Sequence, residues 1–347
     1  MTSRKNPIRV CLIGAGRAGR VHANSLVRHS AQAELVAIVD DMPEIAARVQ
    51  HDFGIERSFA SVEQALDWGA FEAVVITTPT FTHCGFAVAA ANAGKHVFVE
   101  KPMALTLAEC DAMIAAAKAA GVALQIGFMR RFDPDFRAAY ERIQAGEIGR
   151  PMLIKSLTHG PGLPPPWARD AKLSNGMLAE VNSHDWDTAR WLMGSDPARV
   201  HAEVANFKGP ARGVDDPTFY DTALVSIRFE SGALGSISGV CPCDYGYDAR
   251  VEIVGEKGLI QIGEMKGQAV VVVTDRERGL VTPIARTWPE RFAWGYIREI
   301  EHFLDGISTG TQASPGGEDG RWAVAGVLAG TRSFEEERTV TLSEVMG

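Results

Sequence analysis

The feature that most constrains the fold is a glycine-rich turn between an apolar strand and an amphipathic helix. Ile8–Ile13 is a short, mostly aliphatic run, and a Gly-x-Gly-x-x-Gly pattern follows it directly. In this setting the first glycine allows a tight turn, the second lets a pyrophosphate approach the backbone, and the third lets helix and strand pack closely. The helix N-terminus then offers N–H groups to the anion. The pattern predicts a dinucleotide-binding turn made of Gly14, Ala15, Gly16, Arg17, Ala18 and Gly19.

An acidic residue ends the next apolar run. Residues 35–39 are apolar and stop at Asp40, which lies about 20 residues beyond Gly19, the usual spacing of the acid that binds the adenosine ribose. A carboxylate there accepts hydrogen bonds from the ribose hydroxyls and repels a 2′-phosphate. We therefore expect NAD as cofactor and regard NADP as the less favoured alternative, which Arg17 keeps open.

Strand and helix patterns then alternate along the first half of the chain. Strands are expected over residues 73–76, 97–100 and 123–128, with helices between them, which predicts a doubly wound parallel α/β sheet. Thr77, Thr78 and Pro79 follow the first of these strands and are expected to contact the cofactor. His83 falls in the first turn of the next helix, where either a cofactor contact or exposure to solvent is consistent with the pattern.

The run Val97 to Val99 ends abruptly in Glu100, Lys101 and Pro102. Proline keeps the residue before it extended, so Lys101 is expected to project from the carboxyl end of a strand. In open parallel sheets ligands bind at that end. Glu100 and Lys101 are therefore predicted to lie where cofactor and substrate meet.

The alternation breaks near residue 126, so we predict an NAD-binding Rossmann domain over 1–125 and a substrate-binding and oligomerisation α/β domain over 126–347. Strand patterns separated by turns predict a large, mostly antiparallel open sheet in the second domain. The expected strands cover residues 151–157, 201–206, 222–229, 235–239, 249–254, 259–263 and 270–274. Later helices are expected over residues 294–307 and 317–334.

Two stretches of the second half are candidates for a pocket wall. Residues 159–170 are rich in proline and glycine and are expected to form a stiff loop that contains Trp167. Residues 176–194 are expected to form one helix, in which Glu180 and His184 share a face because they are four residues apart. Asn182 and His184 stand among apolar residues, which favours a pocket-facing stripe.

Composition excludes several classes of function. The 347 residues carry a formal net charge of −8, so there is no basic excess for nucleic acid or an anionic membrane. No apolar run is long enough to span a bilayer. The five cysteines are scattered and lack the spacing of a zinc site, so we expect no metal, reduced thiols and a cytoplasmic location.

These motifs occur in the order in which they stand in the Gfo/Idh/MocA oxidoreductases, and the chain resembles that family over essentially its whole length. The shared residues are Gly14, Gly16, Gly19, His22, Asp40, Thr78, Pro79, His83, Glu100, Lys101, Pro102, Glu180, His184, Asp185 and Asp187. The runs 127–134 and 247–258 resemble its inositol 2-dehydrogenase branch. The resemblance implies a Rossmann domain, an open-sheet α/β domain, NAD(P), and homodimers or homotetramers.

The resemblance also implies that Lys101 and His184 are catalytic, and that Glu180 stands where the inositol enzymes commonly have aspartate. We expect His184 to take the hydroxyl proton and Lys101 to polarise the oxygen, although the reverse assignment stays open. Other side chains expected to hold substrate are Arg130 (or its neighbour Arg131), Trp167, Asn182 and Tyr247, and Tyr296 is expected at the nicotinamide edge.

The predicted activity is NAD-dependent oxidation of a secondary hydroxyl of a cyclic polyol or sugar of the inositol type. The longer side chain of Glu180 and the proline-rich stretch leave a pyranoside open as substrate, such as levoglucosan or a glycoside. Two further alternatives are a glycosidase that uses NAD to oxidise and re-reduce the sugar, and a non-catalytic NAD-binding sensor.

Overall fold

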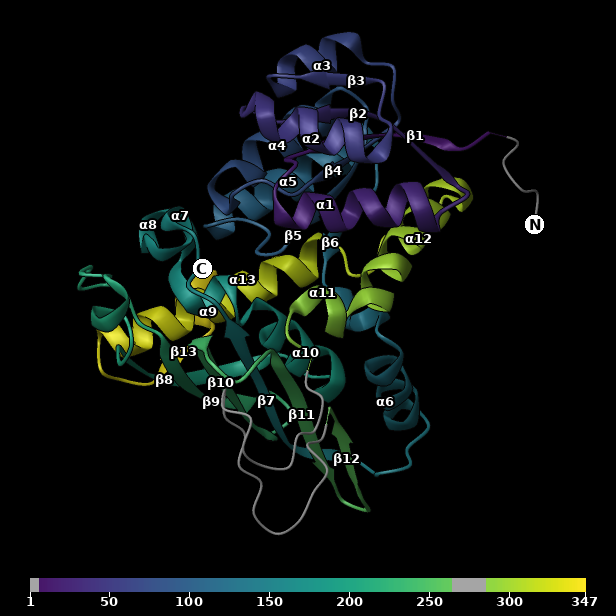
Figure 1. Cartoon of the computed structure of the whole chain (residues 1–347). Helices are drawn as coiled ribbons and strands as arrows, with labels where there is room; N and C mark the ends of the chain where they lie inside the picture. Colours follow the sequence, from purple (N-terminus) through teal and green to yellow (C-terminus); the bar gives the residue numbers. More distant parts are fainter. Residues whose placement is uncertain (1–5, 264–284) are drawn as a thin grey trace. The chain divides into compact units, whose positions relative to one another are not determined.

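The computed structural model describes residues 6–263 and 285–347 (Figure 1). The chain divides into two compact units. The first comprises Met1–Phe132 and Trp294–Arg321, and the second comprises Asp133–Ala293 and Trp322–Gly347. Among the described residues, no helix combines the length and the apolarity that crossing a bilayer requires.

The first unit is built on a six-stranded sheet whose neighbouring strands are all parallel. Its order, β3-β2-β1-β4-β5-β6, is that of a dinucleotide-binding fold and confirms the predicted doubly wound sheet. The strands are β1 (Ile8–Ile13), β2 (Ala33–Val39), β3 (Arg57–Phe59), β4 (Ala73–Ile76), β5 (His96–Glu100) and β6 (Leu124–Gly127). The three-residue β3 was not predicted, because it is too short to show an alternating pattern.

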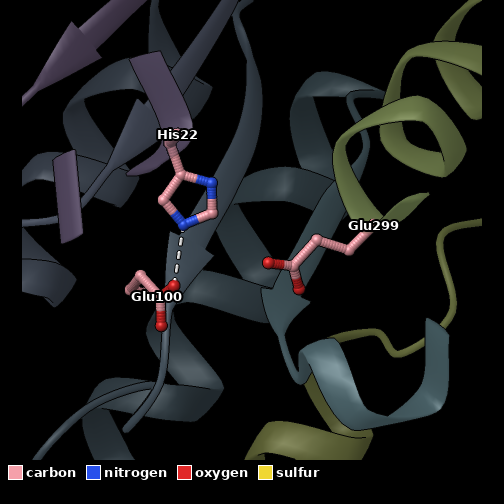
Figure 2. Close-up of side chains that lie close together, drawn as sticks. All are labelled: His22, Glu100 and Glu299. Atoms are coloured by element: carbon pink, nitrogen blue, oxygen red, sulfur yellow. Dashed lines mark hydrogen bonds and ion pairs between the residues drawn. The ribbon is translucent and has the colours of Figure 1, made fainter. Parts of the chain in front are cut away.

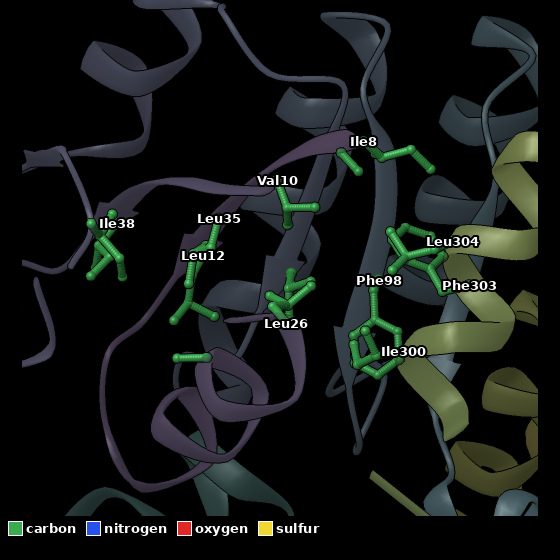
Figure 3. Packing of buried hydrophobic residues seen from close by; sticks show 14 of the residues in the cluster. Ile8, Val10, Leu12, Leu26, Leu35, Ile38, Phe98, Ile300, Phe303 and Leu304 are labelled. Atoms are coloured by element: carbon green, nitrogen blue, oxygen red, sulfur yellow. The ribbon is translucent and has the colours of Figure 1, made fainter. Parts of the chain in front are cut away.

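Helices cover both faces of this sheet, which explains why its central strands are apolar throughout. The helices are α1 (Arg17–Asn24), α2 (Pro43–Phe53), α3 (Val62–Trp68), α4 (His83–Asn92) and α5 (Leu107–Ala120). Thr106 and Glu109 form a capping box at the start of α5. Figure 3 shows the core on the α1 side, where Val10 and Leu12 of β1 pack with Leu26 and Phe98.

A late segment of the chain completes this core. Helix α12 (Ala293–Thr309) contributes Ile300, Phe303 and Leu304 to the same apolar cluster, where they face Phe98 of β5 (Figure 3). The first unit is therefore discontinuous in sequence, unlike the continuous range 1–125 that was expected. Apolar periodicity identified the helix but carried no information about which sheet it covers.

The second unit is built on a seven-stranded sheet of order β12-β11-β7-β10-β9-β8-β13. Its pairs are antiparallel except β7 with β10, which confirms the predicted mostly antiparallel sheet. The strands are β7 (Pro151–Pro161), β8 (Pro197–Ala205), β9 (Thr222–Phe229), β10 (Leu234–Cys243), β11 (Asp248–Gly255), β12 (Leu259–Ile262) and β13 (Val340–Thr341). The strand expected over 270–274 lies outside the described residues.

The remaining helices belong mainly to the second unit, with α13 beginning in the first. They are α6 (Pro134–Gln144), α7 (Pro166–Arg169), α8 (Ala171–Ser174), α9 (Gly176–Glu180), α10 (Ser183–Met193), α11 (Trp288–Arg291), α13 (Gly317–Glu335) and α14 (Ser343–Met346).

The structure corrects the expected loop over residues 159–170. Strand β7 continues to Pro161 and α7 occupies Pro166–Arg169, so only the residues between these elements form an irregular loop. The strand continues because Thr158 and His159 pair with both β10 and β11, while the buried hydroxyls of Ser156 and Thr158 donate to the Asp185 carboxylate. Buried polar residues in a strand are possible only when their hydrogen bonds are satisfied, and the sequence did not show the partner.

The structure also corrects the single helix expected over residues 176–194. Helix α9 ends at Glu180 and α10 begins at Ser183, with Val181 and Asn182 between them. The amide of Asn182 donates to Asp185 Oδ2 at 2.8 Å, so the carboxylate that binds β7 also holds the break. Glu180 and His184 consequently belong to different helices, and the predicted shared helical face does not exist.

Two helical glycines give opposite predictions for stability. A Cβ on Gly326 of α13 would lie 2.6 Å from Trp186 of α10, whereas a Cβ on Gly85 of α4 would meet nothing within 4 Å. We expect Gly326→Ala to lower the free energy of unfolding by about 1–3 kcal/mol through overpacking. Gly85→Ala should raise it by up to about 1 kcal/mol through helix propensity. Urea unfolding measures both, and equal effects of the two substitutions would contradict the packing described.

Candidate active site: a dinucleotide turn and two buried carboxylates

The glycine turn at the end of β1 has the geometry that its sequence predicted. Gly14 has a φ of +92°, which favours glycine, and a Cβ on Gly19 would lie 2.1 Å from the Gly14 carbonyl oxygen. Gly16 is exposed, and a Cβ there would meet no protein atom within 4 Å. The turn is therefore tight against the helix at Gly14 and Gly19 and open at Gly16.

Asp40 ties this turn to the end of β2. Its carboxylate accepts a hydrogen bond from Ala15 N at 2.7 Å through Oδ2 and one from Met42 N at 3.0 Å through Oδ1. The side chain is partly exposed, and each carboxylate oxygen can accept a further hydrogen bond. Asp40 can therefore hold the turn and still accept from a ribose hydroxyl.

The loop after β4 lies next to the turn. The Thr77 hydroxyl donates to the Gly14 carbonyl at 2.6 Å, and the Thr78 and Thr82 hydroxyls are 2.6 Å apart. Pro79 precedes a 3₁₀ turn, Thr80–Thr82, at the start of α4. β1 and β4 are neighbours at the point where the strand order reverses, so these two loops border the expected ligand crevice.

His83 lies inside the protein, with 1% of its surface exposed. Its ring nitrogens lie 2.8 Å from the Pro102 carbonyl oxygen and 2.9 Å from that of Thr78. Burial lowers the pKa of His83, so the neutral ring donates to one of these carbonyls. The histidine therefore connects two loops of the site, and neither of its ring nitrogens faces solvent.

These features fit a dinucleotide. The open position at Gly16 leaves space at the carboxyl edge of the sheet. The N-terminus of α1 offers N–H donors there, and the Asp40 carboxylate offers an acceptor. Arg17 and Ala18 begin α1 beside this opening, and Arg17 is exposed.

Glu100 turns inward at the end of β5 and holds the backbone of Lys101. Its Oε1 lies 2.7 Å from Nε2 of His22 on α1, and its Oε2 accepts from Lys101 N at 3.0 Å (Figure 2). A Cβ on Gly127 of β6 would lie 3.1 Å from Glu100 Cδ, so the glycine makes room for the carboxylate. Tyr296 is also buried, with its ring edge-on to His22 at a centroid distance of 5.6 Å.

His184 is the second residue of α10 and is 5% exposed. The next residue, Asp185, accepts from Ser156 at 2.6 Å, Thr158 at 2.7 Å and Asn182 at 2.8 Å. This carboxylate fixes α10 on β7. Asn182 is fully buried and its amide nitrogen donates to Asp185, and its contact with substrate stays a prediction.

The other predicted substrate residues have different environments. Arg130 is fully buried in a 3₁₀ turn (Met129–Phe132), and its neighbour Arg131 pairs with Asp319 at 2.9 Å. Tyr247 is buried with its ring against Phe292. Trp167 is partly exposed on α7.

Glu180 lines a small pocket that lies entirely in the second unit. The other residues lining it are Pro164, Ala168, Arg169, Gly176, Met177, Val181, Thr218, Phe219, Tyr220 and Cys241. The proline-rich stretch and the end of α9 thus meet, as the sequence suggested for a pocket wall. Lys101 belongs to the first unit and Glu180 and His184 to the second, so the expected approach of Lys101 and His184 stays a prediction.

Comparison with known proteins agrees with this architecture. Residues 8–128 match the sequence profile of an oxidoreductase family with an NAD-binding Rossmann fold, and residues 136–261 match that of the GFO/IDH/MocA C-terminal domain. The chain belongs to the Gfo/Idh/MocA oxidoreductase family. The resemblance inferred from the sequence is confirmed, as are the oxidoreductase class and NAD as the cofactor.

Several members of this family resemble the chain over nearly its whole length. The myo-inositol 2-dehydrogenase of Thermotoga maritima is 34% identical over 344 residues, which are 98% of this chain and 100% of that protein. The scyllo-inositol 2-dehydrogenase (NAD(+)) of Bacillus subtilis is 35% identical over 343 residues, 97% of each chain. The solved scyllo-inositol dehydrogenase of Lactobacillus casei, with bound NAD(H) and scyllo-inositol, has a TM-score of 0.86 at 28% identity and covers 97% of this chain and 100% of its own.

Two groups of polar residues in this Gfo/Idh/MocA protein were not assigned from the sequence. Glu299 of α12 is fully buried near His22 and Glu100 (Figure 2). Its position was readable, since it falls in the apolar stripe that includes Tyr296, Ile300 and Phe303. An acidic residue in such an apolar stripe indicates a carboxyl group that is buried with the apolar side chains.

The second group lies on the sheet of the second unit. His159 of β7 is bonded to Tyr245, whose hydroxyl donates to Asp248 Oδ2 at 3.0 Å, and Arg250 pairs with the same carboxylate. Burial lowers the pKa of His159. Asp248 and Arg250 are two residues apart on β11 and so share a face, but only strand pairing placed His159 opposite Asp248.

Matched alanine substitutions separate folding from cofactor binding in the glycine turn. Gly19→Ala should lower both stability and NAD affinity, because its Cβ would displace α1 from the Gly14 carbonyl. Gly16→Ala should keep the thermal unfolding midpoint of the free protein but weaken NAD binding at least tenfold, because its Cβ projects into the space expected for the pyrophosphate. Calorimetric titration with NAD tests this, and unchanged affinity of Gly16→Ala would contradict the assigned site.

Proposed function

We propose that this oxidoreductase oxidises a secondary hydroxyl of a cyclic polyol of the inositol type to a ketone. The observation that carries the proposal is the likeness over nearly the whole chain to proteins named as inositol dehydrogenases, one of them solved with NAD(H) and scyllo-inositol. The dinucleotide turn, Asp40 and the anchored Lys101 backbone support it. We further propose a cytoplasmic homodimer or homotetramer.

In the proposed reaction the hydroxyl loses a proton while its carbon loses a hydride. NAD, when bound, supplies the acceptor for that hydride. We assign removal of the proton to His184 and polarisation of the reacting oxygen to Lys101, with Glu180 orienting one of them. Asp185 holds the helix that carries His184, and Glu100 holds the backbone of Lys101.

A substrate panel tests the proposal and its alternatives. NADH formation is followed with inositols, hexoses, anhydrosugars and glycosides, each with NAD and with NADP. Oxidation of an inositol supports the proposal, whereas turnover confined to levoglucosan or a glycoside assigns a pyranoside. Aglycone release without net NADH indicates a glycosidase, and NAD binding without any turnover indicates a sensor.

Substitution of the two assigned residues tests the mechanism. Lys101→Ala and His184→Ala should each lower kcat by about 10²–10⁴-fold, the contribution typical of a positioned acid or base, while NAD affinity changes little. Stopped-flow NADH formation and NAD titration measure the two effects. Lys118→Ala and His51→Gln, on exposed helix positions, are matched controls. Turnover near that of the wild type in either active-site variant would remove the assignment.

The length of Glu180 gives a separate prediction about substrate choice. Glu180→Asp withdraws the carboxylate by about one bond length, and a shift of about 1 Å can cost about 10²-fold in rate. We expect the order of kcat/KM across the panel to change while NAD affinity does not. Glu203→Asp, on an exposed position of β8, is the control. An unchanged order would show that Glu180 does not contribute to substrate selection.

A further inference from the structure

A buried acid lies behind the backbone that carries Lys101. Glu299 is fully buried on α12, and neither of its carboxyl oxygens has a hydrogen-bond partner among the described residues. Its carboxyl group points toward His22 and Glu100, and one atom of each of the three side chains lies within 4.8 Å of the others (Figure 2). Two carboxyl groups and one imidazole are therefore enclosed together.

Such a group of side chains can be neutralised by a cation or by protons. The His22–Glu100 contact distinguishes the two. Its 2.7 Å separation is a hydrogen-bond length, whereas two ligands of one tetrahedral zinc ion, each about 2.0 Å from the metal, are about 3.3 Å apart. A proton between His22 and Glu100 fits this distance, and a tetrahedral zinc ion bound by both does not.

We propose that Glu299 is a neutral carboxylic acid at working pH and is a positioning residue for the reaction proposed above. Its proton leaves Glu100 as the single carboxylate of the cluster. Glu100 can then accept from His22 through one oxygen and from the Lys101 backbone through the other. An ionised Glu299 would repel Glu100 and disturb the attachment of Lys101.

The surroundings of Glu299 support a neutral side chain. Burial raises the pKa of its carboxyl group well above its usual range, and the neighbouring Glu100 raises it further. From α1, His22 is the titratable side chain that faces Glu299, and its ring packs against Phe98 and Tyr296.

Neither carboxyl oxygen of Glu299 is hydrogen-bonded to a cationic side chain among the described residues, although charged and polar groups lie on the adjacent elements. From β6, Gln125 donates to the backbone carbonyl of Glu299 and bonds His302 of the same helix. The 3₁₀ turn beside the start of α12 carries Arg131, which is paired with Asp319, and the fully buried Arg130.

Thermal unfolding as a function of pH tests the proton on Glu299 without any substrate. The folded protein keeps this proton where an unfolded glutamate loses it, so its stability falls as pH rises above about 4.3 toward the folded pKa. Across that window the unfolding constant of the wild type should rise by up to about tenfold per pH unit relative to Glu299→Gln. Glu299→Met is a second neutral variant in case the first does not fold, and Glu301→Gln on the same helix is the control.

Infrared spectroscopy gives an independent signature. The wild type should show the C=O stretch of a protonated carboxylic acid at neutral pH, and Glu299→Gln should lose it. Parallel pH–stability curves for wild type and variants, or absence of this band, would overturn the proposal. Stoichiometric metal in the purified protein, removed by Glu299→Gln, would overturn it in favour of an ion.

The positioning role is tested by kinetics. The kcat of the wild type should fall at alkaline pH as Glu299 ionises, and the ratio of kcat at alkaline to neutral pH should be higher in Glu299→Gln. Identical pH profiles would remove the positioning role. If no polyol is oxidised, the proposed function fails, but unfolding and infrared spectra still decide whether Glu299 holds a proton.

Discussion

The first unit depends on a carboxylate that is turned into the protein. Glu100 stands at the end of β5, accepts from His22 of α1 and from the backbone of Lys101, and is 7% exposed. Removing a carboxylate from water is costly unless hydrogen bonds replace the lost hydration. Because those bonds come from the dinucleotide helix and from the Lys101 backbone, the two parts of the predicted site are held in fixed relation within this unit.

The second unit is also held by a buried, hydrogen-bonded carboxylate. Asp185 is fully buried and accepts from two hydroxyls of β7 and from Asn182, which fixes α10 to the sheet at the point where α9 stops. In each unit the buried carboxylate is the immediate neighbour in sequence of a residue that we assign to catalysis. Glu100 precedes Lys101, and Asp185 follows His184. Positioning by rigid, hydrogen-bonded neighbours is what proton transfer in a defined geometry requires.

The sequence determined the first sheet and the dinucleotide turn almost completely. Local patterns carry this information, because β-branched runs, Gly14-x-Gly16-x-x-Gly19 and the capping residues act within a few positions of the chain. Asp40 was predicted from its distance from the turn and its position after an apolar strand, and in the structure its carboxylate accepts a hydrogen bond from Ala15 N of the turn.

Only the tertiary structure shows the features that depend on contacts between residues far apart in the chain. The break between α9 and α10 is held by the hydrogen bond from Asn182 to Asp185, whose carboxylate is bound to β7, and the extension of β7 is held by its pairing with β10 and β11. Helix α12 joins the first sheet because Ile300 and Phe303 pack with Phe98, which lies more than 200 residues earlier in the chain. The proton proposed on Glu299 follows only from the burial that this packing imposes. Periodicity reports which face of an element is apolar but not what covers it, so these features were beyond the sequence alone.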